Sequence, residues 1–163
     1  MKRTTLISAV FVLFVGASCS RPQEPVMNVP KEWKEIRAGN SFSLYAPPGT
    51  TFRSERGIDS FVGGFDGANF RITFDYGAYS NHLNDEVADT RYRVEHFGVG
   101  GQLALFVVGP SRGQDGCGND KEVAAMFVRD AGSQNLLMIL ACMDSEKQTE
   151  TVRTIFRTIR FLN

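Results

Sequence analysis

Both histidines of the chain lie in one polar stretch, residues 75–96, together with several carboxylates. His82 and Glu86 are four residues apart, a spacing that brings two side chains to one face of a helix. Asp75 or His96 would then complete a metal site, since imidazole and carboxylate groups are common metal ligands. The alternative is a solvated polar loop with His96 half buried on a strand. We favour the loop and expect no cofactor, because no spacing here matches a known ligand set.

A second group of polar side chains suggests a binding surface. Arg71, Thr73 and Asp75 alternate along one stretch and so share a face of a strand. Arginine mixed with exposed aromatic residues is common at protein interfaces, so we include the turn that follows. The candidate binding face consists of Arg71, Asp75, Tyr76, Tyr79 and Asn81. The alternative is that helices or solvent cover this face.

The usual catalytic motifs are absent from the sequence. It contains no G-x-S-x-G, no H-E-x-x-H, no P-loop and no C-x-x-C. An enzyme needs a nucleophile, base or metal in a concave site, and no such set is visible. We therefore predict a binding or assembly component. A small metal-dependent or hydrolytic enzyme that uses residues 75–96 is the alternative, and a purely structural spacer is the third possibility.

Alternating hydrophobic residues predict the sheet that positions these groups. Residues 58–76 read as a hairpin that turns at Asp66-Gly67, with Phe65 opposite Ala68. This pairing gives one apolar face, which consists of Phe61, Phe65, Phe70, Ile72, Phe74 and Tyr76. A slip by one residue would bury the charges of the other face, so the choice of face is strongly determined.

Further strands are predicted over residues 41–46, 91–97, 102–108, 122–129 and 135–143. A helix should follow Ser145, because Gln148 lies three residues later in a capping-box pattern. Its apolar residues fall at helical spacing: Val152, Ile155, Phe156 and Ile159. The order of elements predicts an α+β fold in which a C-terminal helix packs on an antiparallel sheet.

The first residues have the features of an export signal. Lys2 and Arg3 precede an apolar run of ten residues, and small residues then lead to Cys19. This pattern resembles a bacterial lipoprotein signal, which implies that Cys19 is lipidated and becomes the new N-terminus. We favour lipidation over an ordinary signal cleaved before Ser18. Ser20 resembles the class sorted to the outer membrane, so we expect an envelope protein that faces the periplasm.

Three segments follow from this pattern: a signal over residues 1–18, a lipid-anchored tether over 19–32 and one α+β domain over 33–163. The tether is rich in proline and mixed charge. Loss of Lys2 and Arg3 from the 18 basic residues leaves 16 against 18 acidic residues, a net charge of −2. Such a balance argues against nucleic acid as a partner. A membrane, through the anchor, and an envelope protein are the expected partners.

Two cysteines remain once Cys19 is assigned to the anchor. An even pair in an oxidising compartment favours a disulfide between Cys117 and Cys142 over two free thiols.

The order of elements carries a second resemblance. An early FSLYAPPGT strand and turn, a run of antiparallel strands, a glycine turn before an apolar strand, and a terminal helix ending in IRF resemble the Mog1/PsbP-like fold. Members include many bacterial envelope lipoproteins. The resemblance implies an antiparallel sheet with helices packed on it and implies no reaction, because a fold does not determine a function.

Overall fold

The computed structural model describes residues 28–80, 82–113, 116–118 and 121–162. The predicted signal, Cys19 and most of the predicted tether lie outside these residues. Within the described part of the chain, no helix is long and apolar enough to span a bilayer.

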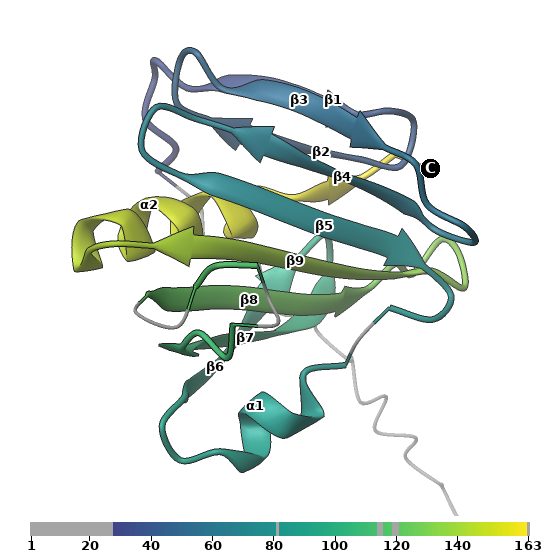
Figure 1. Ribbon diagram of the computed structural model, residues 1–163. Helices are drawn as coiled ribbons and strands as arrows, with labels where there is room; N and C mark the ends of the chain where they lie inside the picture. The colour runs from purple at the N-terminus through teal and green to yellow at the C-terminus, as the bar shows by residue number, and fades with distance from the viewer. Residues whose placement is uncertain (1–27, 81, 114–115, 119–120, 163) are drawn as a thin grey trace, which may run out of the picture.

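The main sheet has seven antiparallel strands in the order β3-β4-β5-β9-β8-β7-β6 (Figure 1). Its strands are β3 (Thr51–Glu55), β4 (Phe61–Asp66), β5 (Arg71–Gly77), β6 (Arg93–Val99), β7 (Gln102–Pro110), β8 (Glu122–Arg129) and β9 (Leu136–Met143). We call the face that packs on the C-terminal helix the inner face and the opposite face the outer face.

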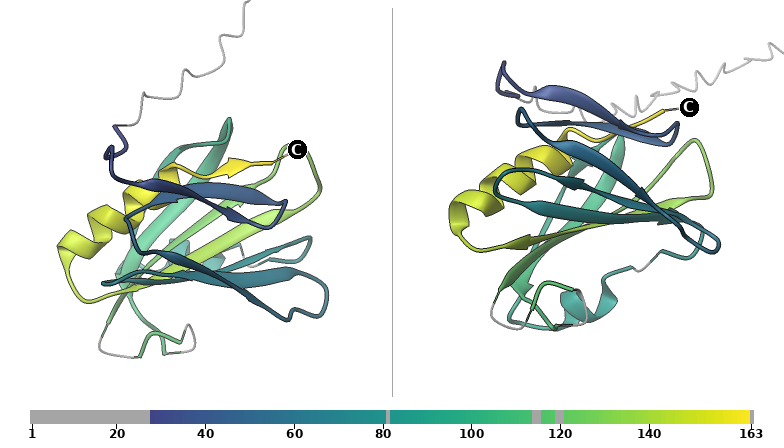
Figure 2. Two further views of the ribbon diagram at one scale, coloured as in Figure 1. Left: turned by 90° about the horizontal axis from the view of Figure 1, so that it is seen from above. Right: turned by 45° about the horizontal axis from the view of Figure 1, so that its top comes forward.

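A second, three-stranded sheet has the order β1-β2-β10, with β1 (Lys34–Ala38), β2 (Phe42–Ala46) and β10 (Arg160–Phe161). Together with helix α2 (Glu146–Arg157) it covers the inner face of the main sheet (Figure 2). The short helix α1 (Asn84–Ala88) lies on the other side of the sheet (Figure 1). The predicted α+β fold, an antiparallel sheet with a C-terminal helix packed on it, is confirmed.

Helix α2 begins where the capping pattern predicts. The Ser145 hydroxyl accepts a hydrogen bond from the backbone N–H of Gln148. The Gln148 side chain accepts a hydrogen bond from the backbone N–H of Asp144. A capping box predicts the N–H of the next residue, Ser145, as the donor. All four predicted apolar residues are buried: Val152, Ile155, Phe156 and Ile159. At the other end, the Thr158 hydroxyl accepts the backbone N–H of Tyr45 at 2.8 Å, which ties the helix to β2.

Aromatic side chains fill the space between the two sheets. Phe42, on β2, is fully buried and meets the rings of Phe65 and Phe74 edge-on, with centroids 6.2 and 5.1 Å apart. Edge-to-face contacts of this kind add to the free energy gained by burial alone. Because Phe42 comes from the small sheet and its partners from the main sheet, this cluster joins the two sheets.

The central hairpin has the predicted faces but a different register. Phe65 pairs with Ile72 rather than with Ala68, so four residues instead of two connect β4 to β5. Phe70 therefore leaves the ladder, and its ring covers Gly67, where a Cβ atom would lie 2.4 Å away. The shift is an even number of residues, so Ile72 still points to the core.

Three strands, β1, β3 and β10, were not predicted, and one was placed differently. Strand β6 begins at Arg93, two residues later than predicted, and buries Val99 rather than His96. His96 is exposed, so the expectation of a half-buried histidine was wrong.

Replacing Phe42 should weaken the contact between the two sheets. We expect Phe42→Ala to lower the free energy of unfolding by about 3–5 kcal/mol, because a buried ring is lost from a packed core. Urea denaturation would measure the change. Tyr79→Ala, which removes an aromatic ring that is 86% exposed, should change stability by about 0.5 kcal/mol or less. Equal losses in the two variants would contradict this account of the core.

Candidate functional site

The outer face of the main sheet is divided into a covered half and an open half. The strand pairing places the two halves side by side, with β6, β7 and β8 in one and β3, β4 and β5 in the other. Strand β9 lies between them.

The covered half is apolar. Leu83 and Tyr92, which flank α1, pack there together with Cys117 over Val107, Val123 and Ala125. Arg112 holds this cover together. Its guanidinium lies 5.3 Å from the centre of the Tyr92 ring and pairs with Glu86 at 3.6 Å and Asp89 at 3.3 Å. The segment around α1 and the loop after β7 therefore form one layer over the sheet.

The open half carries charged and polar side chains. The register places them in adjacent rows on one face: Arg53 and Glu55 on β3, Asp66 on β4, and Arg71, Thr73 and Asp75 on β5. We call this set the open face. Arg71 and Thr73 are exposed, while Asp75 is partly buried and its Oδ1 has no hydrogen-bond partner.

Asp66 lies between two arginines. Its carboxylate accepts the Nε–H groups of Arg53 and Arg71, each at 3.1 Å. Arg53 reaches it across Gly64, where a Cβ atom would lie only 2.6 Å from the guanidinium. Partial burial disfavours the ionised form of Asp66, but the hydrogen bonds and charges of the two arginines outweigh it and lower its pKa. Arg71 is thereby held in place although its side chain is 72% exposed.

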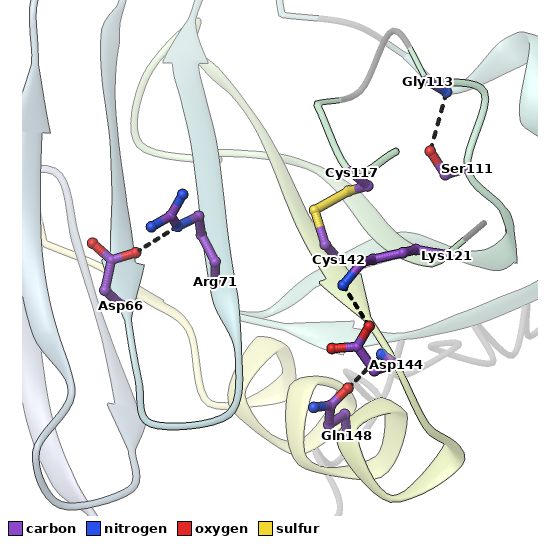
Figure 3. Close-up of a disulfide and its surroundings, with 9 residues drawn as sticks. All are labelled: Asp66, Arg71, Ser111, Gly113, Cys117, Lys121, Cys142, Asp144 and Gln148. Carbon is purple, nitrogen blue, oxygen red and sulfur yellow. Dashed lines mark hydrogen bonds and ion pairs between the residues drawn. A yellow bond between two sulfur atoms is a disulfide. The ribbon is translucent and has the colours of Figure 1, made fainter. Parts of the chain in front are cut away.

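A shallow cleft of about 520 Å³ joins the open face to the disulfide. Cys117 and Cys142 form the disulfide predicted from the sequence, and Cys142 lies directly opposite Arg71 in the ladder (Figure 3). On the far side of the cleft, Lys121 pairs with Asp144 at 2.5 Å. An ion pair therefore lies on each side of the cleft, and the disulfide lies between them.

The cleft continues past the β4–β5 loop toward α2. A second hollow of about 290 Å³ shares Asn69, Phe70 and Gln148 with the first. The prolines Pro47 and Pro48 and the first turn of α2 form its other side. The two hollows give an extended shape, with an aromatic ring and two amide side chains along its middle.

The predicted binding face is only partly assembled. Arg71 and Asp75 lie on the open face, and Tyr79 is exposed two residues beyond β5. Tyr76 points to the inner face, where its hydroxyl donates to Asp130 at 2.6 Å. Burial, and next the Asp130 carboxylate, raise the pKa of Tyr76. Tyr76 was therefore wrongly assigned to the binding face, and Asn81 lies outside the described residues.

The residues of the metal hypothesis are not brought together. Asp75 and His96 lie in one cross-strand row, but the row runs through Met138, Phe127 and Leu105. Four strand spacings separate them by about 19 Å. The His82 ring contacts Phe127 in a tilted arrangement, two strands from His96, and Glu86 pairs with Arg112. The described residues contain no group of three or more histidine, cysteine or carboxylate side chains that could hold a metal ion.

The sequence analysis missed several residues of the site, and one of them could have been found from the predicted strand pairing. The predicted hairpin of residues 122–129 and 135–143, extended by one pair, sets Lys121 opposite Asp144. Arg53 had no signal, because its strand was not predicted. Arg112 had none either, because its partners lie 23 to 27 residues earlier in the chain.

Removing the disulfide should destabilise the fold without changing its topology. The bond closes a separation of 25 residues, which corresponds to roughly 3 to 4 kcal/mol in the chain-entropy model. We expect the double variant Cys117→Ser, Cys142→Ser to lose about this much in urea denaturation. As a control, the double variant should not respond to a reductant, whereas the parent chain should. An unchanged midpoint in the double variant would contradict the stabilising role.

Asp66 should make stability depend on pH. Because its folded pKa lies below the ordinary 3.8, ionised Asp66 stabilises the fold at neutral pH, and this contribution is lost as the pH falls through the folded pKa. We expect Asp66→Asn to be less stable than the parent at pH 7, and the difference to close at acidic pH. Asp59→Asn, an exposed aspartate without an ion pair among the described residues, serves as control. A difference that stays constant with pH would contradict the pairing.

No protein-family model matches this chain, and no curated protein matches it. The two resemblances drawn from the sequence, to a lipoprotein signal and to the Mog1/PsbP-like fold, therefore stay predictions.

Proposed function

We propose that this chain is an exported, lipid-anchored protein of a bacterial cell envelope that acts by binding a protein partner, without catalysis. The anchor is at Cys19, and the open face with its cleft is the binding site. The observation that carries the proposal is the exposure of this charged face, because the other half of the same sheet face is covered.

The anchor is supported by the sequence pattern. A basic start, an apolar run too short to span a bilayer, and small residues before Cys19 are typical of a lipoprotein signal. A lipid anchor with more than one acyl chain holds a protein firmly on a membrane, whereas a single chain binds weakly. Ser20 favours the outer membrane, with the domain in the periplasm. The Mog1/PsbP-like resemblance agrees with this setting, since that fold includes many envelope lipoproteins.

Arg71 is the residue that we expect to contact the partner directly. Its Nε–H donates a hydrogen bond to Asp66, and its two terminal nitrogens have no hydrogen-bond partner among the described residues. A guanidinium held from one side presents a fork of donors that suits a carboxylate. A partner with an acidic side chain that enters the cleft beside Cys142 would meet this fork.

A binding role also agrees with how the polar segment 75–96 is used. Glu86 and Asp89, which an enzyme would need as ligands or bases, are engaged by Arg112. Arg91 also pairs with Asp89, and these contacts lower the pKa of Asp89. A depressed pKa makes Asp89 a poor general base at neutral pH. The segment serves to cover the sheet.

Photo-crosslinking in intact cells would test the proposal. A photoreactive residue at Thr73, in the open face, should capture one recurrent protein, while the same residue at Thr154 on α2 should not. Arg71→Gln should reduce the product severalfold, because it removes the donor fork. The matched control is Arg93→Gln, which replaces an exposed arginine that has no ion pair among the described residues.

Identical products from Thr73 and Thr154, or an Arg71→Gln variant that crosslinks like the parent, would contradict the binding site. The anchor has a separate readout. The parent chain should incorporate a labelled fatty acid, and Cys19→Ser should not. Label retained in Cys19→Ser would exclude Cys19 as the point of attachment.

A further inference from the structure

Three large apolar side chains are exposed at one end of the main sheet. Ile58 is 104% exposed, Tyr79 86% and Leu103 72%, the three highest values among the large hydrophobic side chains of the described residues. We call these three residues the apolar rim. Burial of such side chains is favourable, so a group of them in water indicates a surface that meets another apolar phase.

The antiparallel topology places the rim. Ile58 lies in the β3–β4 loop, Tyr79 follows β5, and Leu103 is the second residue of β7. Since β4 and β7 start where β5 ends, all three lie at the same end of the sheet. The ends of β4 and β5 that carry Ile58 and Tyr79 are on the right in Figure 1, and β7 lies four strands from β4. The first two loops touch: a Cβ atom on Gly77 would lie 2.6 Å from Ser60 Cβ.

The charges around the rim that have no ion pair among the described residues are mainly positive. Arg56 and Arg129 are both exposed, and neither has an ion pair among the described residues. Two exposed acidic residues lie nearby: Asp59 beside Ile58, and Glu55, which lies beside Arg56 and pairs with Arg53. Apolar tips flanked by basic side chains are the pattern by which proteins enter the interface of an anionic membrane, where tyrosine is also favoured.

The chain before the domain is long enough to allow this contact. Strand β1 starts at Lys34, at the end of the molecule opposite the rim, because its other end, at Gly39, packs against Phe61. The 14 residues 20–33 extend to at most about 50 Å. A nine-residue strand such as β7 spans about 30 Å. A tether fixed at Cys19 can therefore run the length of the domain and let the rim reach the same membrane.

We propose that the apolar rim docks on the membrane that holds the lipid anchor, with Ile58 and Tyr79 in the headgroup region and Arg56 and Arg129 against anionic lipid. The proposal rests on the anchor at Cys19. Docking would stand the domain on this end of the sheet. The cleft beside Asp66 and Arg71 lies at the opposite end of the same strands, so it would point away from the bilayer.

Fluorescence quenching in reconstituted vesicles would test the docking. The full lipidated chain, with Trp33→Phe to remove the single tryptophan, carries Ile58→Trp, Tyr79→Trp or Val87→Trp. Val87 is an exposed apolar residue of α1, 47% exposed, and is the matched control. The vesicles contain phosphatidylcholine and phosphatidylglycerol, with or without brominated acyl chains. We expect about twofold or greater quenching and a blue shift at positions 58 and 79, and neither at 87.

Flotation with the vesicles tests the lipid anchor separately from the docking of the rim. A chain that floats but shows no quenching at positions 58 and 79 overturns the docking and leaves the anchor intact. Equal quenching at all three positions also overturns it, because contact would not be confined to the rim. A chain that does not float overturns the anchor and the docking with it. Arg56→Gln with Arg129→Gln should reduce the quenching, and an unchanged value would exclude the basic residues from the contact.

Discussion

The aromatic contact between the two sheets is the interaction on which the structure depends. Phe42 brings the small sheet against Phe65 and Phe74 of the main sheet, and α2 closes the same layer with Val152 and Phe156. An antiparallel sheet presents apolar side chains on one face at every second residue, and that face must be removed from water. Because α2 and the small sheet are both used on the inner face, little chain remains for the outer one.

The outer face is therefore covered only in part. The chain around α1 and the disulfide loop cover the apolar half, held by Arg112 and by the Cys117–Cys142 bond. In the part of the chain that the structure describes, no such cover lies over the half that carries Arg53, Asp66 and Arg71. The ion pairs there are partly exposed, so each contributes little to stability. Their main effect is to fix positions. Asp66 holds the exposed Arg71 side chain beside a cleft that is bordered by the disulfide.

The parts of the fold that could be predicted are those set by residues close together in the chain. Helix α2 was predicted because Ser145, Gln148 and the apolar spacing act within a few residues of one another. The faces of the β4–β5 hairpin were predicted for the same reason, but its register was not. Alternation fixes which side of the sheet Ile72 occupies, and every even shift satisfies it equally. The contact of the Phe70 ring with Gly67 belongs to the observed four-residue loop, and no sequence period reports such a contact.

The sequence by itself determined the α+β class, the faces of the central strands, the C-terminal helix and the pairing of Cys117 with Cys142, because each is governed by local periodicity or by the small number of cysteines. Tertiary structure alone decided which polar side chains meet. It buried Tyr76 against Asp130, bound Glu86 to Arg112 and set Arg53 across Gly64 to reach Asp66. These partners lie 13 to 54 residues apart in the chain. Their contacts follow from strand order, which determines the neighbours of a side chain and is not encoded in the spacing of residues along one strand.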